Sequence, residues 1–229
     1  MHPAVAVVLS YVSGSIPSAY LAGRWSGVDL RAHGSGNLGA TNVLRVLGPR
    51  IGLLVFAVDI AKGALPVWFF PRMTPLAGDV RVWVAVGCGV AAILGHIRPL
   101  FLGFGKGGKG VATACGVFLA LAPVQTLLTL IVFAVVLLSS GYVSLGSLTS
   151  GLMLPVLLGL TIGVRSPVFA ISVAVAAFVF WTHRANIKRL RNGEEHRFGK
   201  RGVPAKRPAA TLAISLVIVL AVLVATRLA

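Results

Sequence analysis

Charged residues are scarce in this sequence, and acidic residues are the scarcest. Only 11% of the 229 residues are charged, and just five are Asp or Glu. A soluble domain carries roughly 25% charged residues, so this chain has too few to cover a surface that faces water. The hydrophobic fraction is 57% and the mean hydropathy is +0.92. This composition excludes an ordinary soluble protein and indicates a membrane protein.

Alternation of polar and apolar residues is also lacking, which argues against a transmembrane β-barrel. Apolar runs near membrane-spanning length recur instead: Ile51–Phe70, Val82–Leu94, Val124–Leu138 and Leu212–Thr226. We therefore expect an all-α, polytopic transmembrane helical protein with about seven spans plus an extra C-terminal span. The predicted spans are 3–22, 51–70, 81–97, a hairpin of 111–122 and 124–139, then 148–163, 167–182 and 209–226. Residues 1–200 would form a membrane domain, and 201–229 a C-terminal extension holding the additional span.

Cysteine is rare as well. Cys88 and Cys115 lie in or beside apolar segments, and their spacing fits neither a metal site nor a disulfide framework. Met1–Leu21 lacks a basic start and a convincing cleavage site, so it predicts a retained first span with the N-terminus outside, rather than a signal peptide.

Basic residues are more frequent, and they are unevenly placed. The net charge is +16, and 16 of the 21 Lys and Arg residues fall in the predicted loops 23–50, 95–110 and 183–207. This asymmetry follows the positive-inside rule and places the three loops in the cytoplasm. Orientation and attraction to anionic lipids explain the charge better than nucleic-acid binding does.

The first of these loops contains the stretch HGSGNLGATNVLR, residues 33–45. Glycines allow backbone N–H groups to converge into an anion-binding concavity. Thr41 and Arg45 share a face if a helix starts here, and Thr41 could be its N-cap, with the positive end of the helix dipole aimed at an anion. The stretch predicts phosphate binding, with neutral donors from Ser35, Asn37, Thr41 and Asn42. The alternative is a flexible re-entrant turn followed by a capped helix.

The second loop, Gly95–Gly110, contains Gly103–Lys109, which matches the G-x-x-x-x-G-K pattern of nucleotide-binding P-loops. Gly110 stands where such a loop needs Ser or Thr, and no strand precedes it, so we reject nucleotide binding. Two lysines around two glycines still resemble a phosphate clamp. The alternative is a basic loop that only sets orientation.

The third segment is His183–Glu195. A helix continuing from span 167–182 would put His183 and Asn186 on one face, with Arg189 one turn further along. The alternative for His183 is an interfacial bystander. Since all three polar segments lie on the predicted inner side, we expect one site for an anionic, water-borne substrate. Within span 51–70, Asp59 and Lys62 predict either a structural ion pair or a support for this site.

These motifs together resemble those of the bacterial membrane glycerol-3-phosphate acyltransferases that use acyl-phosphate, the PlsY family. The resemblance runs in order from about residue 10 to 200. It rests on GSGNLGATNVLR (34–45), DIAKG (59–63), GHIRPLF (95–101) with KGGKG (106–110), YVSLGS (142–147) and HRANIKRLRNGEE (183–195).

The resemblance implies an enzyme of the bacterial inner membrane with its motifs in the cytoplasm. The reaction would transfer a fatty acyl group from acyl-phosphate to glycerol 3-phosphate, giving lysophosphatidic acid and phosphate, the first acylation of phospholipid synthesis. The membrane domain over 1–200 would then be the acyltransferase domain. Its partners would be these two substrates, membrane lipids and an upstream enzyme that makes acyl-phosphate, with no metal, no cofactor and no nucleic acid.

Motif chemistry and resemblance together select the candidate site residues. We predict catalytic roles for Ser35, His183 and Asn186. Substrate-binding roles are predicted for Gly36, Asn37, Thr41, Asn42, Arg45, His96, Lys106, Gly107, Gly108, Lys109, Ser144, Arg189 and Glu195.

Three features depart from the family pattern. Gly105 intervenes between Phe104 and the KGGKG motif, which the family joins directly. Gly141 precedes YVSLGS where the family often has a basic residue. The chain also continues past the third polar segment, HRANIKRLRNGEE (183–195), which we call the third motif, whereas the family usually ends soon after it.

The expected chemistry needs no nucleophilic triad, because phosphate is already a good leaving group, and the sequence shows none. His183 is the only motif side chain with a suitable ordinary pKa for a base, but Glu195 is three turns away and no carboxylate is placed to orient it. We therefore expect His183 and Asn186 to position substrate while a substrate phosphate accepts the proton. The alternative functions are an organic-anion or phosphate transporter and a non-catalytic lipid-binding protein.

Overall fold

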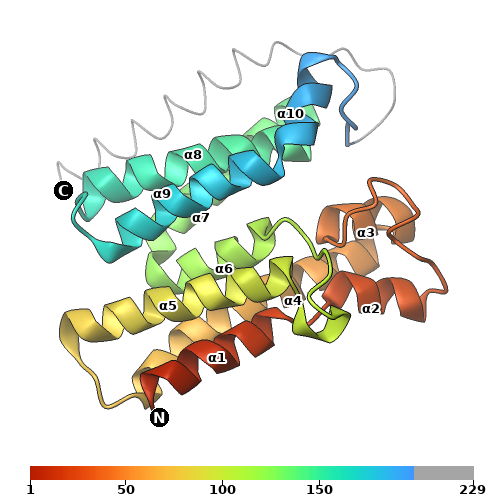
Figure 1. Ribbon diagram of the computed structural model, residues 1–229. Helices are drawn as coiled ribbons and strands as arrows, with labels where there is room; N and C mark the ends of the chain where they lie inside the picture. Colours follow the sequence, from red (N-terminus) through yellow and green to blue (C-terminus); the bar gives the residue numbers. More distant parts are fainter. Residues whose placement is uncertain (199–229) are drawn as a thin grey trace. The chain divides into compact units, whose positions relative to one another are not determined.

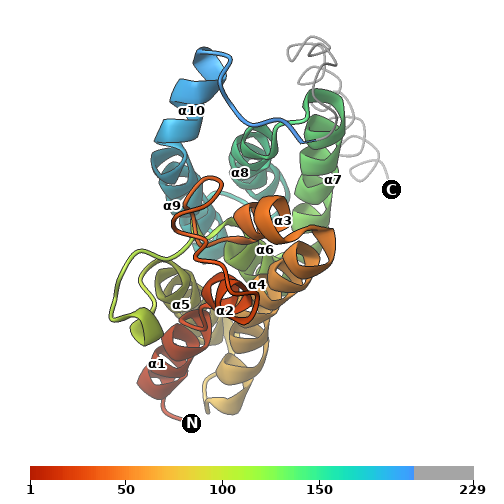
Figure 2. The ribbon, with the colours of Figure 1, turned by 90° about the vertical axis from the view of Figure 1, so that its right-hand side faces the viewer.

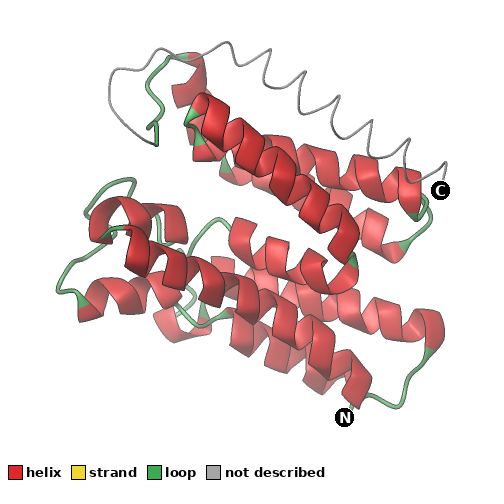
Figure 3. Cartoon of the chain, turned by 180° about the vertical axis from the view of Figure 1, so that it is seen from behind, coloured by secondary structure: helices red, strands yellow, loops and turns green. Residues whose placement is uncertain are grey.

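The computed structural model describes residues 1–198, and every regular element within them is a helix (Figure 3). Two short 3₁₀ turns, η1 and η2, cover Phe70–Met73 and Leu100–Leu102. The α-helices are α1 (Pro3–Gly14), α2 (Ser18–Trp25), α3 (Ala40–Leu47), α4 (Pro49–Phe69), α5 (Gly78–Ile97), α6 (Val111–Leu121), α7 (Pro123–Ser140), α8 (Val143–Thr161), α9 (Pro167–Thr182) and α10 (Arg184–Arg191). The all-α prediction is confirmed for these residues. The predicted extension 201–229, with its span at 209–226, lies outside them.

Length and apolarity show which helices can cross a bilayer. Five segments within residues 1–198 qualify: Pro3–Trp25, Pro49–Met73, Gly78–Leu102, Pro123–Ser140 and Val143–Thr161. Pro167–Thr182 and Arg184–Arg191 form a further candidate that is bent by 57°. α6 has 11 residues and measures only about 16 Å at 1.5 Å per residue, against a hydrocarbon core of ~30 Å. The predicted hairpin therefore consists of one short apolar helix, α6, and one helix of spanning length, α7.

Prolines and glycines set several helix boundaries. α4, α7 and α9 each begin at a proline, whose fixed φ and missing N–H suit the first helical position. The start predicted for the span 148–163 is wrong, because α8 already begins at Val143. The reversal needs only residues 141 and 142, since Gly141 takes a left-handed φ of 77°.

The first predicted span, 3–22, is broken. α1 ends at Gly14 and α2 begins at Ser18, with Pro17 immediately before it. A proline disfavours helical geometry in the preceding residue, so the backbone leaves the helix at Ile16. The Ile16 carbonyl then accepts a hydrogen bond from Lys62 Nζ at 2.8 Å. The break thus turns a backbone acceptor toward a buried cation of α4.

The chain forms two compact units. The first contains Met1–Pro123 and Arg165–Ile171, and the second contains Val124–Val164 and residues 172–198. In the first unit α1, α4, α5 and α6 lie side by side (Figures 1 and 2). Glycines allow α4 and α6 to approach closely, because a Cβ at Gly63 would overlap the Thr113 carbonyl and one at Gly116 would overlap the Ile60 carbonyl.

A separate cluster of the first unit packs beneath the first polar loop. Its buried members come from α2, α3, α4 and the segment between α2 and α3, and they are Ala19, Ala22, Leu30, Leu38, Val43 and Val55. In the second unit, α7 and α8 meet through Val132, Val136 and Leu157. Each unit therefore has an apolar core that supports its own part of the polar motifs.

Candidate functional site

The first polar loop is shaped by two left-handed glycines. Gly34 and Gly36 have φ values of 63° and 67°, a conformation that other residues adopt only with strain. Position 34 must also lack a side chain, because a Cβ there would overlap Asn42 Oδ1. The loop closes tightly over Asn42, as a backbone-lined anion site requires.

Asn42 organises this loop from below. Its Nδ2 donates to the carbonyls of Leu30 at 3.0 Å and His33 at 3.1 Å. Its Oδ1 accepts from the Ser35 N–H at 2.8 Å and from Ser35 Oγ at 3.2 Å. Both amide hydrogens and the amide oxygen are therefore engaged within the protein. Its predicted substrate-binding role remains a prediction, and the contacts show that it holds Ser35 in place.

Ser35 is exposed, and donating its proton to Asn42 leaves the lone pairs of its hydroxyl available. The following helix, α3, has Gly39 as its N-cap, so the prediction that Thr41 is the N-cap is wrong. Gly39 takes the extended conformation of an N-cap residue, so the helix begins at Ala40, before Thr41. Thr41 and Arg45 do lie on α3 four residues apart, as predicted, and so share one face.

The second polar loop is anchored directly to the end of α5. The Gly107 N–H donates to the Ile97 carbonyl at 2.9 Å, and the Gly108 N–H donates to the His96 carbonyl at 3.3 Å. The extra residue, Gly105, falls before this anchor, in a turn where its N–H donates to the Leu102 carbonyl at 3.1 Å. The turn uses a left-handed Phe104 with φ 59°. The added residue is absorbed there, and the lysine-flanked glycines keep their attachment.

The two loops meet at Gly108. A Cβ on Gly108 would overlap His96 Nε2 and would lie 2.7 Å from the carbonyl oxygen of Leu38, a residue of the first loop. Gly107 is equally confined, because its Cβ would overlap the His96 carbonyl. The predicted set Gly107, Gly108, Lys106 and Lys109 is therefore brought next to the first loop within one compact unit.

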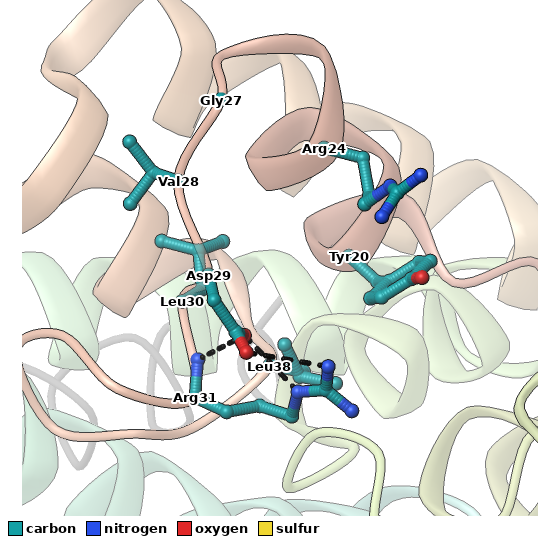
Figure 4. A pocket seen from close by; sticks show the side chains of 8 residues that line it. All are labelled: Tyr20, Arg24, Gly27, Val28, Asp29, Leu30, Arg31 and Leu38. Carbon is teal, nitrogen blue, oxygen red and sulfur yellow. Dashed lines mark hydrogen bonds and ion pairs between the residues drawn. The ribbon is translucent and has the colours of Figure 1, made fainter.

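A surface cavity of about 290 Å³ lies beside the first loop (Figure 4). Sequence reasoning counted its arginines only as orienting charges. Arg31 pairs with Asp29 through Nε at 3.0 Å, and its guanidinium lies 5.6 Å from the Tyr20 ring centroid. Hydrogen bonds from Arg31 hold the pKa of the Asp29 carboxyl below its ordinary value. The cavity is lined by Tyr20, Arg24, Gly27, Val28, Asp29, Leu30, Arg31 and Leu38.

The prediction that one continuous helix runs into the third motif is wrong. α9 ends at Thr182, and His183 is the N-cap of α10, which bends away by 57°. His183 is buried, and its Nδ1 lies 2.8 Å from the Val179 carbonyl. Because a carbonyl can only accept, Nδ1 carries the proton in a neutral ring, and Nε2 is then the unprotonated nitrogen. The bend at His183 therefore gives this side chain a defined tautomer.

Glu195 joins two predicted residues of the third motif. Its carboxylate accepts from Asn186 Nδ2 at 2.6 Å and from Arg189 Nε at 2.6 Å. Burial tends to raise the pKa of Glu195. The hydrogen bonds from Asn186 and Arg189 lower this pKa by more than burial raises it, so the net pKa falls below its ordinary value. Glu195 is thus a buried anion that fixes the Asn186 amide. Sequence spacing from His183 did not reveal this partnership.

The YVSLGS motif lies in the same unit as Glu195. Ser144 is buried on the first turn of α8. Next to it, the Arg197 guanidinium lies 5.7 Å from the Tyr142 ring centroid, and Arg197 Nε donates to the Ser140 carbonyl at 3.3 Å. Arg197 therefore places a cation beside Gly141, at the position where the family often has a basic residue.

Within residues 1–198, no three His, Cys, Asp or Glu side chains gather closely enough to hold a metal ion. The first unit brings together backbone N–H groups, hydroxyls and cations suited to phosphate groups. The second brings together His183, Asn186 and Arg189, suited to orienting a polar substrate. The expectation that all of these residues form one site remains a prediction.

Comparisons with known proteins agree with these observations. A sequence model described as "Glycerol-3-phosphate acyltransferase" matches residues 4–193. A glycerol-3-phosphate acyltransferase of Synechococcus sp. (strain CC9902) is 47% identical over 86% of this chain and 95% of its own. One of Geotalea daltonii is 44% identical over 85% and 96%, respectively.

The fold is similar to that of PlsY (YgiH), an integral membrane glycerol 3-phosphate acyltransferase. Its crystal structure in the glycerol 3-phosphate form has a TM-score of 0.77 and 40% identity, covering 86% of this chain and 96% of that one. The lysophosphatidic acid form has a TM-score of 0.74 and 39% identity, covering 86% and 95%. The match spans both glycine loops and the helices of both units, and we conclude that the chain belongs to the glycerol-3-phosphate acyltransferase family.

Proposed function

We propose that this acyltransferase moves a fatty acyl group from acyl-phosphate to glycerol 3-phosphate. The products are lysophosphatidic acid and inorganic phosphate, and the reaction is the first acylation of phospholipid synthesis. The acceptor and product follow those named for the similar PlsY structures. The donor is our inference from the loops of the first unit.

The adjacency of two phosphate-type loops is the observation that carries this proposal. The loop around Gly34–Gly39 and the loop around Lys106–Gly110 touch at Gly108. A Cβ on Gly108 would lie only 2.7 Å from the carbonyl oxygen of Leu38. Both substrates in the proposed reaction carry a phosphate group, and in acyl-phosphate that group is bonded directly to the reacting carbonyl. Two adjacent loops suit two phosphates whose reacting atoms must meet.

A coenzyme A thioester fits this arrangement less well. Its phosphates are separated from the thioester by the long pantetheine arm, so phosphate loops at the reaction centre would not hold them. The third motif also supports an activated donor. The buried carboxylate, Glu195, binds Asn186 and Arg189, and His183 Nδ1 contacts the Val179 carbonyl. This is an arrangement for orienting groups rather than for activating a nucleophilic serine.

In the reaction, the primary hydroxyl oxygen of glycerol 3-phosphate attacks the carbonyl carbon of acyl-phosphate. A C–O ester bond forms, the C–O bond to phosphate breaks, and the hydroxyl proton leaves with the phosphate. Loop N–H groups would stabilise the oxyanion, an effect worth about 3 kcal/mol for one such donor. Holding the two substrates in contact supplies up to roughly 7–11 kcal/mol.

We assign the phosphate charges to Arg45, Lys106 and Lys109, and the hydroxyl to His183 and Asn186. His183 and Asn186, the latter held by Glu195, position glycerol 3-phosphate by hydrogen bonds. A phosphate oxygen of the substrate takes the proton. The leaving phosphate needs little acid assistance, which lowers the demand on the protein.

We place the enzyme in the bacterial inner membrane with its three polar segments in the cytoplasm and its N-terminus outside. The distribution of basic residues supports this orientation. Acyl-phosphates are reactive mixed anhydrides, so a cytoplasmic or membrane enzyme that makes them must supply this one.

The donor is tested with purified protein and glycerol 3-phosphate. We expect lysophosphatidic acid and stoichiometric phosphate from acyl-phosphate, and no product from acyl-CoA of the same chain length. Turnover with acyl-CoA alone would overturn the donor assignment. Uptake of glycerol 3-phosphate into proteoliposomes without product would favour transport.

Orientation is tested by labelling single cysteines with a membrane-impermeant maleimide. The exposed sites are Ala32→Cys, Asn192→Cys and Pro75→Cys. The first two should react only from the cytoplasmic side and the third only from outside. The parent protein is the control, since Cys88 is buried and Cys115 is partly buried. Labelling of Ala32→Cys and Asn192→Cys from opposite faces would refute the assignment.

Phosphate binding is tested at Arg45 and Lys109. Charge-assisted hydrogen bonds contribute about 1.5–3 kcal/mol, so Arg45→Ala and Lys109→Ala should each lower kcat/KM by roughly tenfold or more. Arg50→Ala, an exposed arginine at the start of α4, is the matched control and should change kcat/KM less than about twofold. Near-wild-type kcat/KM in both loop variants would contradict the anion site.

The role of His183 is tested by conservative substitution. If a substrate phosphate accepts the proton, His183→Gln and His183→Asn should retain much more activity than His183→Ala, since an amide still forms hydrogen bonds. General-base help from a protein group is typically worth about 10²–10⁴ in rate. The same large loss in all three variants, together with a wild-type pH–rate profile that follows one ionisation near pH 6–7, would make His183 the base.

A further inference from the structure

A cluster of buried charges lies behind the two phosphate loops. Asp59 and Lys62 of α4 and His96 at the end of α5 are only 1%, 5% and 6% exposed. Asp59 Oδ1 accepts from Lys62 Nζ at 2.8 Å and from Ser18 Oγ at 2.6 Å. His96 Nδ1 faces the same oxygen at 3.7 Å. Burying such groups in a membrane protein is costly unless they serve a purpose.

The cluster joins segments that are distant in the sequence. Lys62 Nζ also donates to the Ile16 carbonyl, exposed by the break between α1 and α2. Ser18, the first residue of α2, donates to Asp59. The ion pair therefore ties the broken first span to α4, and His96 extends the connection to the end of α5. A plain stabilising role would not require this convergence, since buried ion pairs contribute little net stability.

His96 carries the connection to the second loop. Its carbonyl accepts the Gly108 N–H, and its Nε2 occupies the space that a Gly108 side chain would need. Gly108 in turn lies against the Leu38 carbonyl of the first loop. The imidazole thus packs against Gly108 of the second loop, and Gly108 connects it to the first loop.

Little room for substrate remains on this side of the loop. Only about 10 Å³ of space remains between Ser18, Lys62, His96, Gly107 and Gly108, room for one water molecule at most. His96 is 6% exposed and therefore offers little surface to a phosphate group. Its predicted substrate-binding role stays a prediction, and its contacts favour a role in holding the loop.

We propose that His96 is a positioning residue, which Asp59 and Lys62 hold in place so that the two loops keep the spacing needed to bind two phosphate-bearing substrates. The inference rests on the proposed function for the identity of those substrates. A loop that is displaced loses hydrogen bonds to phosphate in the ground state and the transition state alike. Loss of such uniform binding raises KM more than it lowers kcat.

The test is a kinetic comparison of purified His96→Ala, His96→Gln and Ser18→Ala. His96→Ala should raise KM for glycerol 3-phosphate and acyl-phosphate by about tenfold or more and weaken inhibition by inorganic phosphate equally, as expected for lost hydrogen bonds to charged groups. Its kcat should stay within about threefold. His96→Gln keeps a polar group near Gly108 and should recover most of the affinity. Ser18→Ala should show a smaller increase in KM.

Two further variants separate positioning from folding. Asp59→Leu combined with Lys62→Met removes both buried charges without leaving one unpaired, so it should fold, with thermal unfolding as the check, and still show the raised KM. Ser10→Ala is the matched control, because this buried hydroxyl of α1 donates to Ala6 in its own helix. It should leave KM unchanged. If His96→Ala fails to fold, Ser18→Ala and the Asp59–Lys62 double variant decide the question.

Folded His96→Ala with KM and phosphate inhibition within twofold of the wild type would overturn the inference, as would a loss confined to kcat. Failure of the proposed acyl-phosphate donor can be distinguished from failure of this inference. If the wild type is inactive with acyl-phosphate but active with acyl-CoA, KM for glycerol 3-phosphate and inhibition by inorganic phosphate, measured with acyl-CoA, still test the positioning role.

Discussion

The carboxylate of Asp59 is the point on which much of the first unit depends. A charge at this depth requires partners, and it obtains them from α2, from its own helix and from α5. Each partner constrains a different segment. Ser18 requires α2 to start after the break, Lys62 draws in the Ile16 carbonyl, and His96 places the end of α5 beneath the glycine loop. A single buried oxygen therefore links the backbone break of the first span to both phosphate loops.

Glycine supplies the second constraint, by allowing backbones to approach one another. In the bundle, Gly63 and Gly116 let α4 and α6 touch. In the loops, Gly34 makes room for Asn42, and Gly108 makes room for His96. The same physical property thus packs the spans and shapes the anion sites. Replacing a loop glycine would displace a polar group that other residues hold, so loop geometry and bundle packing are not independent.

The sequence predicted the features that depend on local pattern. Hydropathy located α9 at 167–182 and predicted a helix start at residue 124, one residue after α7 begins. The spans predicted from hydropathy missed the break at Gly14–Ser18, although Gly14 and Pro17 are local signals for one, and they missed the bend at His183. The pairing of Asp59 with His96 and of Asn186 with Glu195 joins residues that share no helical spacing. Such contacts arise from tertiary packing and leave no periodic signal in the sequence.

Sequence reasoning also treated polar motif residues as one class, whereas the structure separates them by what they bind. Asn42, His96 and Glu195 direct their polar atoms at other protein groups. Ser35, by contrast, keeps the lone pairs of an exposed hydroxyl for another partner. This division suits a reaction whose donor is already activated. When the leaving group needs little help, rate depends mainly on how firmly two substrates are held together. Residues that hold the loops then matter as much as residues that touch the substrates, and a larger share of the polar motif can serve as support.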